Sequence, residues 1–471
     1  MSGEQLLKEI GEFCRNTGLA ESTFGRLAIN DGKLVSRLRD GGTITTHTLD
    51  RLRTFMEGRR ETSLHTNAAS HNNGTAQAIP FPPVRLPARR FNAPDAASGQ
   101  ANFRFFDNRQ KYLLFVNTCS EKWVVANRVA MELGNISPRP PAVRVFDAGV
   151  GDGTVLSRAL RAMHARFPTM PFYVVGKEIS LEDVRLTLEK LPDRFFEHPA
   201  SVLTLTNLYY AEAPWLTAKS PISAQALIWK EVALTGKCSH DFEQQLTELQ
   251  SFLSENWTAK ASAKTGNPVY ERPVVLSIYR EDHRFLLDPI LPRPGRTIAD
   301  YDLIIASQPY RARASAEFKA RKVIGPLARA VGPGGRLIGV HSCGDDPGLE
   351  IVRQIWPDEN PFQTDRHQIL KAVKADLGSA GRHLNFNAYA DARSVFRYDM
   401  HTLPSEVQGS IGTSTLFAAW NAAIYVAQIE DQRLSEAVKD DQYLQATDAV
   451  LKKYGGLWFN DESYVISRRR D

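Results

Sequence analysis

The chain has little cysteine and no cysteine pairs. Its 471 residues include four cysteines, at Cys14, Cys119, Cys238 and Cys343, and no two of them form a C-x-x-C motif. This spacing provides neither a disulfide framework nor a zinc knuckle, and it is typical of proteins in a reducing compartment. We therefore assign no metal site and expect a cytoplasmic protein.

The chain also lacks a long hydrophobic run and a strong charge of either sign. Its most apolar stretch, residues 416–427, is interrupted by Asn421 and is shorter than the ~20 residues that a membrane span requires. Residues 1–9 lack the basic start and apolar core of a secretory signal. We therefore expect no membrane partner. The net charge of +5 is compatible with a nucleic-acid partner but does not demonstrate one.

Composition divides the chain into three parts. Residues 1–60 carry apolar side chains at helical spacing between short turns, which predicts a small all-α domain. Residues 61–100 are polar and then proline-rich, which predicts a flexible linker. In residues 101–471 strand and helix patterns alternate, as they do in an α/β domain with a mostly parallel sheet.

Seven strands are expected in this third part. The predicted strands are residues 143–147, 172–178, 201–206, 302–307, 335–341, 386–398 and 457–467. The last two mix polar and apolar residues, and we expect them to form an antiparallel pair at one edge. Two insertions, residues 208–300 and 403–452, are expected to be largely helical.

A glycine-rich turn follows the first predicted strand. The segment Asp147-Ala-Gly-Val-Gly-Asp-Gly-Thr154 places glycines at positions 149, 151 and 153, just before a predicted helix. Glycines there let the backbone turn tightly and approach a nucleotide closely. A dinucleotide fingerprint, G-x-G-x-x-G, requires a third glycine where this chain has Thr154. The spacing therefore disfavours a nicotinamide-dependent oxidoreductase.

An acidic residue followed by G-x-G-x-G resembles motif I of the class I S-adenosylmethionine (SAM)-dependent methyltransferases. The resemblance implies a Rossmann-like seven-stranded methyltransferase sheet with helical insertions, and SAM as the cofactor. It places Asp147, Gly149, Gly151 and Gly153 against the methionine part of SAM. It also implies that Glu178, at the end of the second strand, binds both ribose hydroxyls, because a carboxylate accepts two hydrogen bonds at once.

Two further residues have a cofactor role and a structural role as alternatives. Asn207 follows the third strand, where the resemblance implies a polar residue beside the adenine, and the alternative is a turn residue that ends the strand. Tyr112 precedes the motif and either covers the cofactor or belongs to a helix that packs on the sheet.

The segment after the fourth strand bears on the methyl acceptor. Ser307-Gln-Pro-Tyr310 resembles the [DNS]-P-P-[YFW] motif of methyltransferases that act on amino groups of DNA bases and glutamine amides. The resemblance implies that Ser307 and Tyr310 face the acceptor, although Gln308 replaces the first proline. His341 ends the fifth strand and is a candidate general base. The alternatives are an ordinary loop exit for the first segment and a hydrogen-bonded structural histidine for the second.

Residues 22–55 have the rhythm of a helix-turn-helix. They resemble repressor-type DNA-binding domains, which implies a DNA partner read by Lys33, Ser36, Arg37 and Arg39. Residues 1–60 contain ten Lys and Arg against eight Asp and Glu, a weak basic footprint for a DNA-binding domain. The alternative is a helical bundle that serves docking or homodimer formation.

The sequence therefore predicts a SAM-dependent methyltransferase with an appended helix-turn-helix-like domain. Its acceptor stays open among a nucleobase, a protein side chain and a small molecule. The alternative is a DNA-binding regulator whose methyltransferase-like domain senses SAM without turnover. Turnover distinguishes the two, because an enzyme must release S-adenosylhomocysteine.

Overall fold

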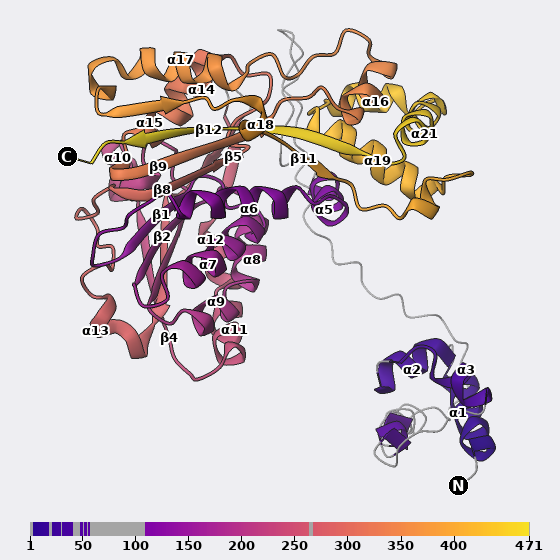
Figure 1. The fold of residues 1–471 in the computed structure, drawn as a ribbon. Helices are drawn as coiled ribbons and strands as arrows, with labels where there is room; N and C mark the ends of the chain where they lie inside the picture. Colours follow the sequence, from indigo (N-terminus) through magenta and orange to yellow (C-terminus); the bar gives the residue numbers. More distant parts are fainter. Residues whose placement is uncertain are drawn as a thin grey trace, which may run out of the picture. The chain divides into compact units, whose positions relative to one another are not determined.

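The computed structural model (Figure 1) places the chain in two units, Met1–Asp95 and Ala96–Asp471. We call them the N-terminal and C-terminal units. The predicted linker, residues 61–100, lies outside the described residues. The structure describes residues 3–17, 21–29, 31–40, 48–49, 51–53, 55–56, 109–262 and 267–470.

The N-terminal unit contains helices α1 (Gly3–Thr17), α2 (Glu21–Ile29) and α3 (Leu34–Arg39). Apolar side chains of all three meet in one small core, which is why the helical spacing was visible in the sequence. The turn between α2 and α3 is tight, because the Asp31 N–H donates to the Gly25 carbonyl at 3.0 Å. A Cβ on Gly25 would lie 2.2 Å from the Asp31 oxygen, so this approach requires glycine. The predicted third helix lies partly outside the described residues.

The four side chains predicted to face DNA are exposed on and before α3. Two of them are engaged within the unit: Arg37 pairs with Asp31 at 2.8 Å, and Arg39 pairs with Glu21 at 2.6 Å. Exposed pairs of this kind are weak, so they do not prevent either arginine from contacting a phosphate. DNA binding by this unit stays a prediction.

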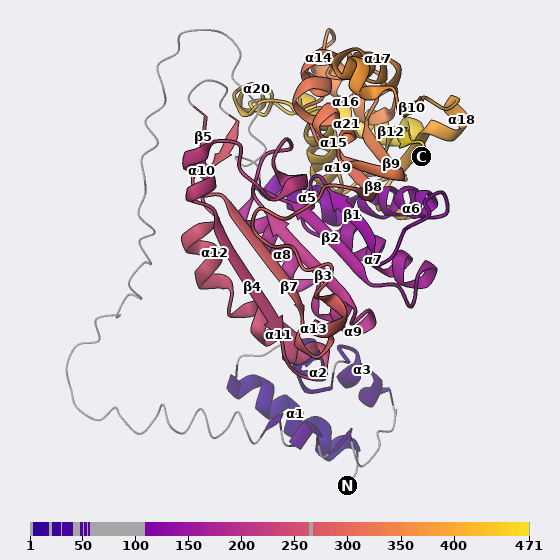
Figure 2. The same cartoon turned by 90° about the vertical axis from the view of Figure 1, so that its left-hand side faces the viewer.

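The C-terminal unit is built on one large sheet (Figure 2). Its strands run in the order β10-β12-β9-β8-β1-β2-β3-β7-β4. The strands are β1 (Val143–Asp147), β2 (Phe172–Lys177), β3 (Ser201–Thr206), β4 (Ile228–Leu234), β7 (Val274–Arg280), β8 (Tyr301–Ser307), β9 (Val331–Ser342), β10 (Leu384–Asn387) and β12 (Trp458–Arg468). From β3 to β9 by way of β1 the pairing is parallel, whereas β12 is antiparallel to both β9 and β10. The predicted α/β fold with an antiparallel pair at one edge is confirmed.

Two details of the predicted sheet were wrong. The predicted strand 386–398 is two strands, β10 and β11 (Val395–Asp399), separated by α18 (Asp391–Ser394), and both pair with β12. The first insertion is not largely helical, because β4 and β7 extend the sheet beyond β3. All residues of β7 are buried, and its hydrophobic run pairs antiparallel with β3. A small hairpin of β5 (Ala259–Ala261) and β6 (Pro268–Tyr270) also belongs to this insertion.

Helices cover both faces of the sheet, because side chains alternate along each strand. On β1, Val143 and Val145 enter one hydrophobic cluster, while Phe146 enters the other. The first cluster packs under α6 (Glu121–Leu133), α7 (Thr154–Arg166), α8 (Leu181–Glu189), α9 (Pro192–Glu197), α11 (Ser239–Thr247) and α12 (Gln250–Asn256). The second packs under α13 (Arg284–Leu287), α15 (Gly325–Ala328) and α17 (Arg366–Leu377).

The second insertion is helical, as predicted, and forms a third cluster with helices from elsewhere in the unit. Its Asn421 amide donates to the Lys111 carbonyl at 3.0 Å and so ties the insertion to the segment before the glycine-rich turn. The helices involved are α5 (Arg109–Thr118), α16 (Pro347–Ile355), α19 (Thr413–Val426), α20 (Asp431–Ala437) and α21 (Gln442–Tyr454). The remaining helices are α10 (Pro221–Gln225) and α14 (Ala316–Lys319). Within the described ranges, no helix has the length and hydrophobicity that crossing a membrane requires.

Candidate functional site

The glycine-rich turn joins β1 to α7 at the carboxyl edge of the sheet. Gly151 and Gly153 have φ angles of +56° and +80°, in the left-handed region that glycine adopts without strain. A Cβ on Gly153 would lie 2.8 Å from the Thr187 Cα, so the turn also requires glycine for space. A Cβ on Gly149 would meet nothing within 4 Å. Gly149 therefore faces open space, as the backbone beside a ligand must.

Asp147 ends β1, with only 1% of its surface exposed. Its Oδ1 accepts a hydrogen bond from the Gly149 N–H at 3.1 Å, whereas its Oδ2 is buried with no partner among the described residues. Burial raises the pKa of Asp147 to about 7, the Gly149 hydrogen bond opposes the rise, and the Glu178 carboxylate adds to it. A buried carboxylate oxygen without a donor is costly, and a ligand N–H or O–H would remove that cost.

Glu178 follows β2 directly and is held against the turn. Its Oε2 accepts from the Gly151 N–H at 2.9 Å, and its Oε1 accepts from the N–H groups of Ile179 and Ser180 at 2.7 and 2.9 Å. These contacts bring the two strongest sequence signals, the glycine turn and the strand-end acid, into direct contact. Because each carboxylate oxygen has two lone pairs, Oε2 can accept a further hydrogen bond.

Asn207, predicted either beside a cofactor or as a structural residue at the end of β3, is bound to the neighbouring backbone. Its Nδ2 donates to the Arg272 carbonyl and its Oδ1 accepts from the Val274 N–H, both at 2.8 Å. The side chain is buried and fastens the end of β3 to the start of β7. The alternative structural role therefore describes it better, and this could not be foreseen while β7 was read as part of a helical insertion.

Tyr112 of α5 covers the turn. Its hydroxyl accepts from the Asp152 N–H at 3.1 Å and lies 3.4 Å from the Asp152 Oδ1. A Cβ on Gly151 would lie 3.0 Å from the same hydroxyl. Tyr112 is both a covering residue and a buried packing residue, with 5% of its surface exposed.

Lys122, at the start of α6, contributes a cation that the sequence analysis missed. Its Nζ lies 3.1 Å from the Glu121 Oε2, and 18% of its side chain is exposed. Burial by itself would lower the pKa of Lys122, but the charges of Glu121 and Asp152, among others, raise it above its ordinary value. The ammonium therefore stays charged beside the acids of the turn. A Glu-Lys pair opening a helix is too common a signal to have identified it.

The segment predicted to face the acceptor begins where β8 ends. The Ser307 Oγ is buried without a hydrogen-bond partner among the described residues. Gln308 has a φ of +47°, unusual for a residue other than glycine. Its Nε2 lies 3.1 Å from the Ser342 Oγ and 3.3 Å from each carboxylate oxygen of Asp461 on β12. Asp461 was also missed, because it lies far away in the sequence.

Tyr310 is not placed to stack on an acceptor. Its ring is buried, its hydroxyl lies 3.2 Å from that of Tyr464, and the Lys319 ammonium lies 4.9 Å from its ring centroid. Lys319 is buried as well, and its Nζ donates to the Ala312 carbonyl and to the Thr364 hydroxyl. The predicted contact with the acceptor is therefore not supported for Tyr310, whereas Ser307 stays at the strand edge.

His341 belongs to a buried ion-pair network. Its Nε2 lies 3.1 Å from the Glu462 Oε1, and the Glu462 Oε2 accepts from the Arg366 Nη1 at 2.6 Å. Burial would raise the pKa of Glu462, but His341 and Arg366 outweigh it and lower that pKa to about 2. A histidine held in this way, with 4% of its surface exposed, matches the structural alternative.

Tyr210 connects the two halves of this edge and was not singled out in the sequence. It is partly exposed, and its hydroxyl donates to the Pro309 carbonyl at 2.7 Å. The Lys177 ammonium lies 4.9 Å from its ring centroid. Burial raises the pKa of Tyr210, and the charges of Glu178 and Asp147 raise it further, which places its hydroxyl within the electrostatic reach of both acids.

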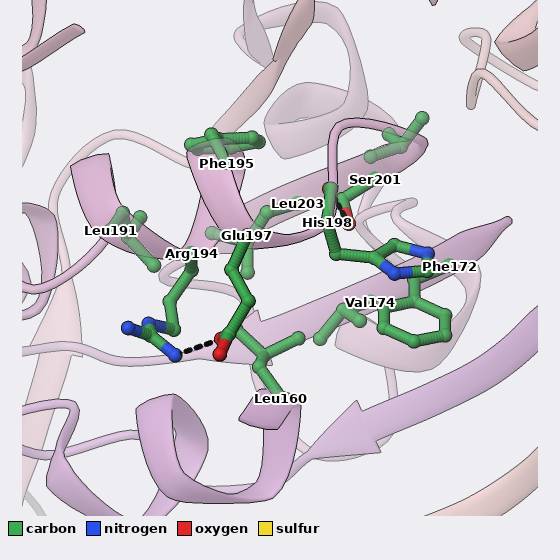
Figure 3. Close-up of a pocket in the computed structure, with 11 residues that line it drawn as sticks. Leu160, Phe172, Val174, Leu191, Arg194, Phe195, Glu197, His198, Ser201 and Leu203 are labelled. Carbon is green, nitrogen blue, oxygen red and sulfur yellow. Dashed lines mark hydrogen bonds and ion pairs between the residues drawn. The ribbon is translucent and has the colours of Figure 1, made fainter. Parts of the chain in front are cut away.

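Two hollows are present in this unit, one at the amino ends of the strands and one that begins at Arg313, just after the segment 307–310. A cavity of about 10 Å³, room for one water, lies at the amino end of β2 and β3 beside His198 (Figure 3). The His198 ring stacks on Phe172 there, with centroids 3.6 Å apart. A groove of about 720 Å³ lies between residues 313–321 and 363–376. Within the described residues, no three His, Cys, Asp or Glu side chains are grouped to hold a metal ion.

The similarity of this chain to known proteins is distant. No family model matches the chain, and no curated protein matches it in sequence. It is similar to a solved geranyl diphosphate methyltransferase, with 13% identity and a TM-score of 0.26 over 73% of this chain and 77% of that one. A putative sarcosine dimethylglycine methyltransferase from Galdieria sulphuraria shares 10% identity, with a TM-score of 0.26 over 74% and 85% of the two chains.

A third similar structure is PKMT2 from Rickettsia typhi in complex with AdoHcy. It shares 11% identity with a TM-score of 0.25, and the match covers 74% of this chain and 53% of that one.

Proposed function

We propose that the C-terminal unit is a SAM-dependent methyltransferase. The observation that carries the proposal is the meeting of the glycine turn with Glu178 beside Asp147, whose Oδ2 is buried and unpartnered. An oxygen of this kind suits the ammonium group of the methionine part of SAM. The open space at Gly149 would let that part of SAM lie against the backbone of the turn. The residues present therefore fit the cofactor.

Within this proposal each residue has a chemical task. Asp147 would accept from the cofactor ammonium, Gly149 would leave room for it, and Glu178 would accept from a ribose hydroxyl through the remaining lone pair of its Oε2. Lys122 offers its ammonium to the cofactor carboxylate. Asn207 is omitted, because its amide is fixed to the backbone of β7.

When bound, SAM would supply an activated methyl group for a nucleophilic acceptor, with S-adenosylhomocysteine as the leaving group. The protein's share is to hold the acceptor in line. Ser307 is the residue we assign to that side, because its buried hydroxyl has no hydrogen-bond partner in the part of the chain that the structure describes. The acceptor itself stays open, and so does DNA binding by the N-terminal unit.

The first test is a calorimetric titration of the whole chain with SAM, S-adenosylhomocysteine and NAD. We expect saturable binding of the first two and none of NAD. Glu178→Ala should weaken SAM binding by about 1–3 kcal/mol, because it leaves the turn N–H groups and a ribose hydroxyl without their acceptor. Glu189→Ala, which removes an exposed acid of α8, is the matched control and should change nothing.

Absence of SAM binding by a folded, ligand-free sample would overturn the proposal. Turnover is tested separately, by incubating the protein with methyl-labelled SAM and fractions of a cell extract and measuring S-adenosylhomocysteine. Saturable binding with no release in any fraction would favour the sensing regulator.

A further inference from the structure

The loop after β8 is held in a strained conformation. Gln308 adopts a φ of +47°, which costs energy for any residue with a Cβ. Such a conformation persists where the surroundings fix it, and it is often found at ligand sites. Contacts on both sides of Gln308 hold the backbone in this conformation.

On one side the loop is held by β12. The Gln308 amide donates to the Asp461 carboxylate and to the Ser342 hydroxyl, and the Gln308 Oε1 accepts from the Ser342 N–H at 3.3 Å. Asp461 has no exposed surface, so its position is set by the strand that carries it. This side of the loop is anchored to the sheet.

On the other side the loop is held by Tyr210. The Tyr210 hydroxyl donates to the Pro309 carbonyl at 2.7 Å, the shortest neutral hydrogen bond described for this loop. Tyr210 follows β3, its ring lies beside the Lys177 ammonium, and its hydroxyl feels the charges of Glu178 and Asp147. The same side chain therefore contacts the loop after β8 and packs beside Lys177, the residue that precedes Glu178.

We propose that Tyr210 is a positioning residue that transmits SAM occupancy to the acceptor loop, with Asp461 as the fixed anchor opposite. A ligand bound at Glu178 would restrict the end of β2 with Lys177 and the Tyr210 ring packed on it, and the Pro309 hydrogen bond would pass that restriction to residues 307–313. The acceptor site is then completed after SAM binds, so that binding is ordered with SAM first. This inference rests on the proposed function.

The test measures amide hydrogen exchange of residues 307–313 by mass spectrometry, with and without saturating SAM. In the unchanged protein we expect SAM to slow exchange in this segment about tenfold, because a restrained loop opens less often. In Tyr210→Phe, which keeps the ring and removes the hydroxyl, SAM should bind within about threefold of the original affinity. The SAM-dependent slowing should nevertheless fall below about twofold.

The matched control is Tyr209→Phe. Tyr209 is adjacent, is 38% exposed, and stacks on Tyr270 with ring centroids 4.5 Å apart, and no contact with Pro309 is described for it. It should keep the full SAM-dependent slowing. A hydroxyl with a purely structural role would, when removed, speed exchange equally with and without SAM.

Asp461→Asn provides a second variant, because the amide keeps the shape of the carboxyl group. It should speed exchange of the loop in both states while preserving the ratio between them. A SAM-dependent slowing that survives in Tyr210→Phe, or that is absent from the unchanged protein although SAM binds, would overturn the inference and leave the proposed function standing. Failure of the unchanged protein to bind SAM would remove both.

Discussion

The carboxyl edge of the sheet has two halves, which we name after their proposed roles: the cofactor edge carries the glycine turn and Glu178, and the acceptor edge carries Gln308. The two halves are built differently. At the cofactor edge, the glycine turn and Glu178 come from consecutive strands, and most contacts run to backbone N–H groups. At the acceptor edge, Gln308 depends on Asp461, a side chain 153 positions away in the sequence. A site made of local backbone contacts leaves a motif in the sequence, and a site made of distant side chains does not.

The largest expected effect comes from breaking the local site. Gly151→Leu should reduce SAM binding at least about 100-fold, because φ at this position is +56° and a Cβ would lie 3.0 Å from the Tyr112 hydroxyl. Gly134→Leu is the matched control, since Gly134 has a φ of −72° and its Cβ would meet no atom closer than 3.6 Å. Calorimetry on folded samples measures both. Binding retained by Gly151→Leu would place SAM elsewhere.

A smaller effect concerns pH at the same edge. The pKa of Asp147 is about 7, raised first by burial, so the free protein carries a proton there at lower pH. A neutral carboxyl attracts a cationic ligand less, and SAM affinity should therefore fall as pH decreases from about 8 to 6, by up to about tenfold per unit. Asp147→Asn should flatten this dependence. Asp183, whose pKa burial and Glu178 also raise to about 7, provides the residual slope.

The stability linkage of Asp147 has the opposite sign. Its folded pKa lies above the ordinary value of 3.8, so the native state binds the proton more tightly than the unfolded chain does. The associated stabilisation is full below about pH 4 and is lost as pH rises through 7. Asp147→Asn should therefore stabilise the ligand-free protein near pH 8, which thermal unfolding measures. A pH dependence of SAM affinity unchanged by this substitution would contradict the assigned role.

The smallest expected effect concerns His198, which lies at the amino ends of the strands, away from the glycine turn. Burial lowers the pKa of His198 to about 4, where its ordinary value is 6.5. Between these values the unfolded chain binds a proton that the native state refuses, so the free energy of unfolding should fall as pH falls from 6.5 to 4. His198→Phe should weaken this pH dependence, so that the fall in Tm at pH 5 is smaller by about a few degrees. The control is His240→Gln, an exposed site, and SAM affinity should not change in either variant.

The sequence predicted most of the sheet because each core strand carries its own hydrophobic pattern. Phe172–Lys177 is buried at every residue, and its largely apolar sequence is typical of a central parallel strand. Ser201–Thr206 is also buried at every residue, although half of its side chains are polar. The pattern failed for β4, which is partly exposed along most of its length, and for β7, whose pairing with β3 is a long-range event. That missed pairing is also why Asn207 was assigned to a ligand.

The candidate site divides in the same way. Asp147 and Glu178 were found because the residue type and the strand end were both legible in the sequence. Tyr210, Lys122 and Asp461 were not, since their importance lies in what they touch. Tyr310 had two alternatives for a related reason: a ring beside a loop can face a ligand or a core, and the contact with Tyr464 favours the core.

The position of β12 affects how the protein is made. Strands β1, β2 and β3 leave the ribosome long before residues 458–468, which must then insert between β9 and β10. During synthesis the cofactor edge can therefore assemble while the acceptor edge still lacks Asp461 and Glu462. We expect that a nascent chain halted before β12 would form the proposed SAM site but not the proposed acceptor site.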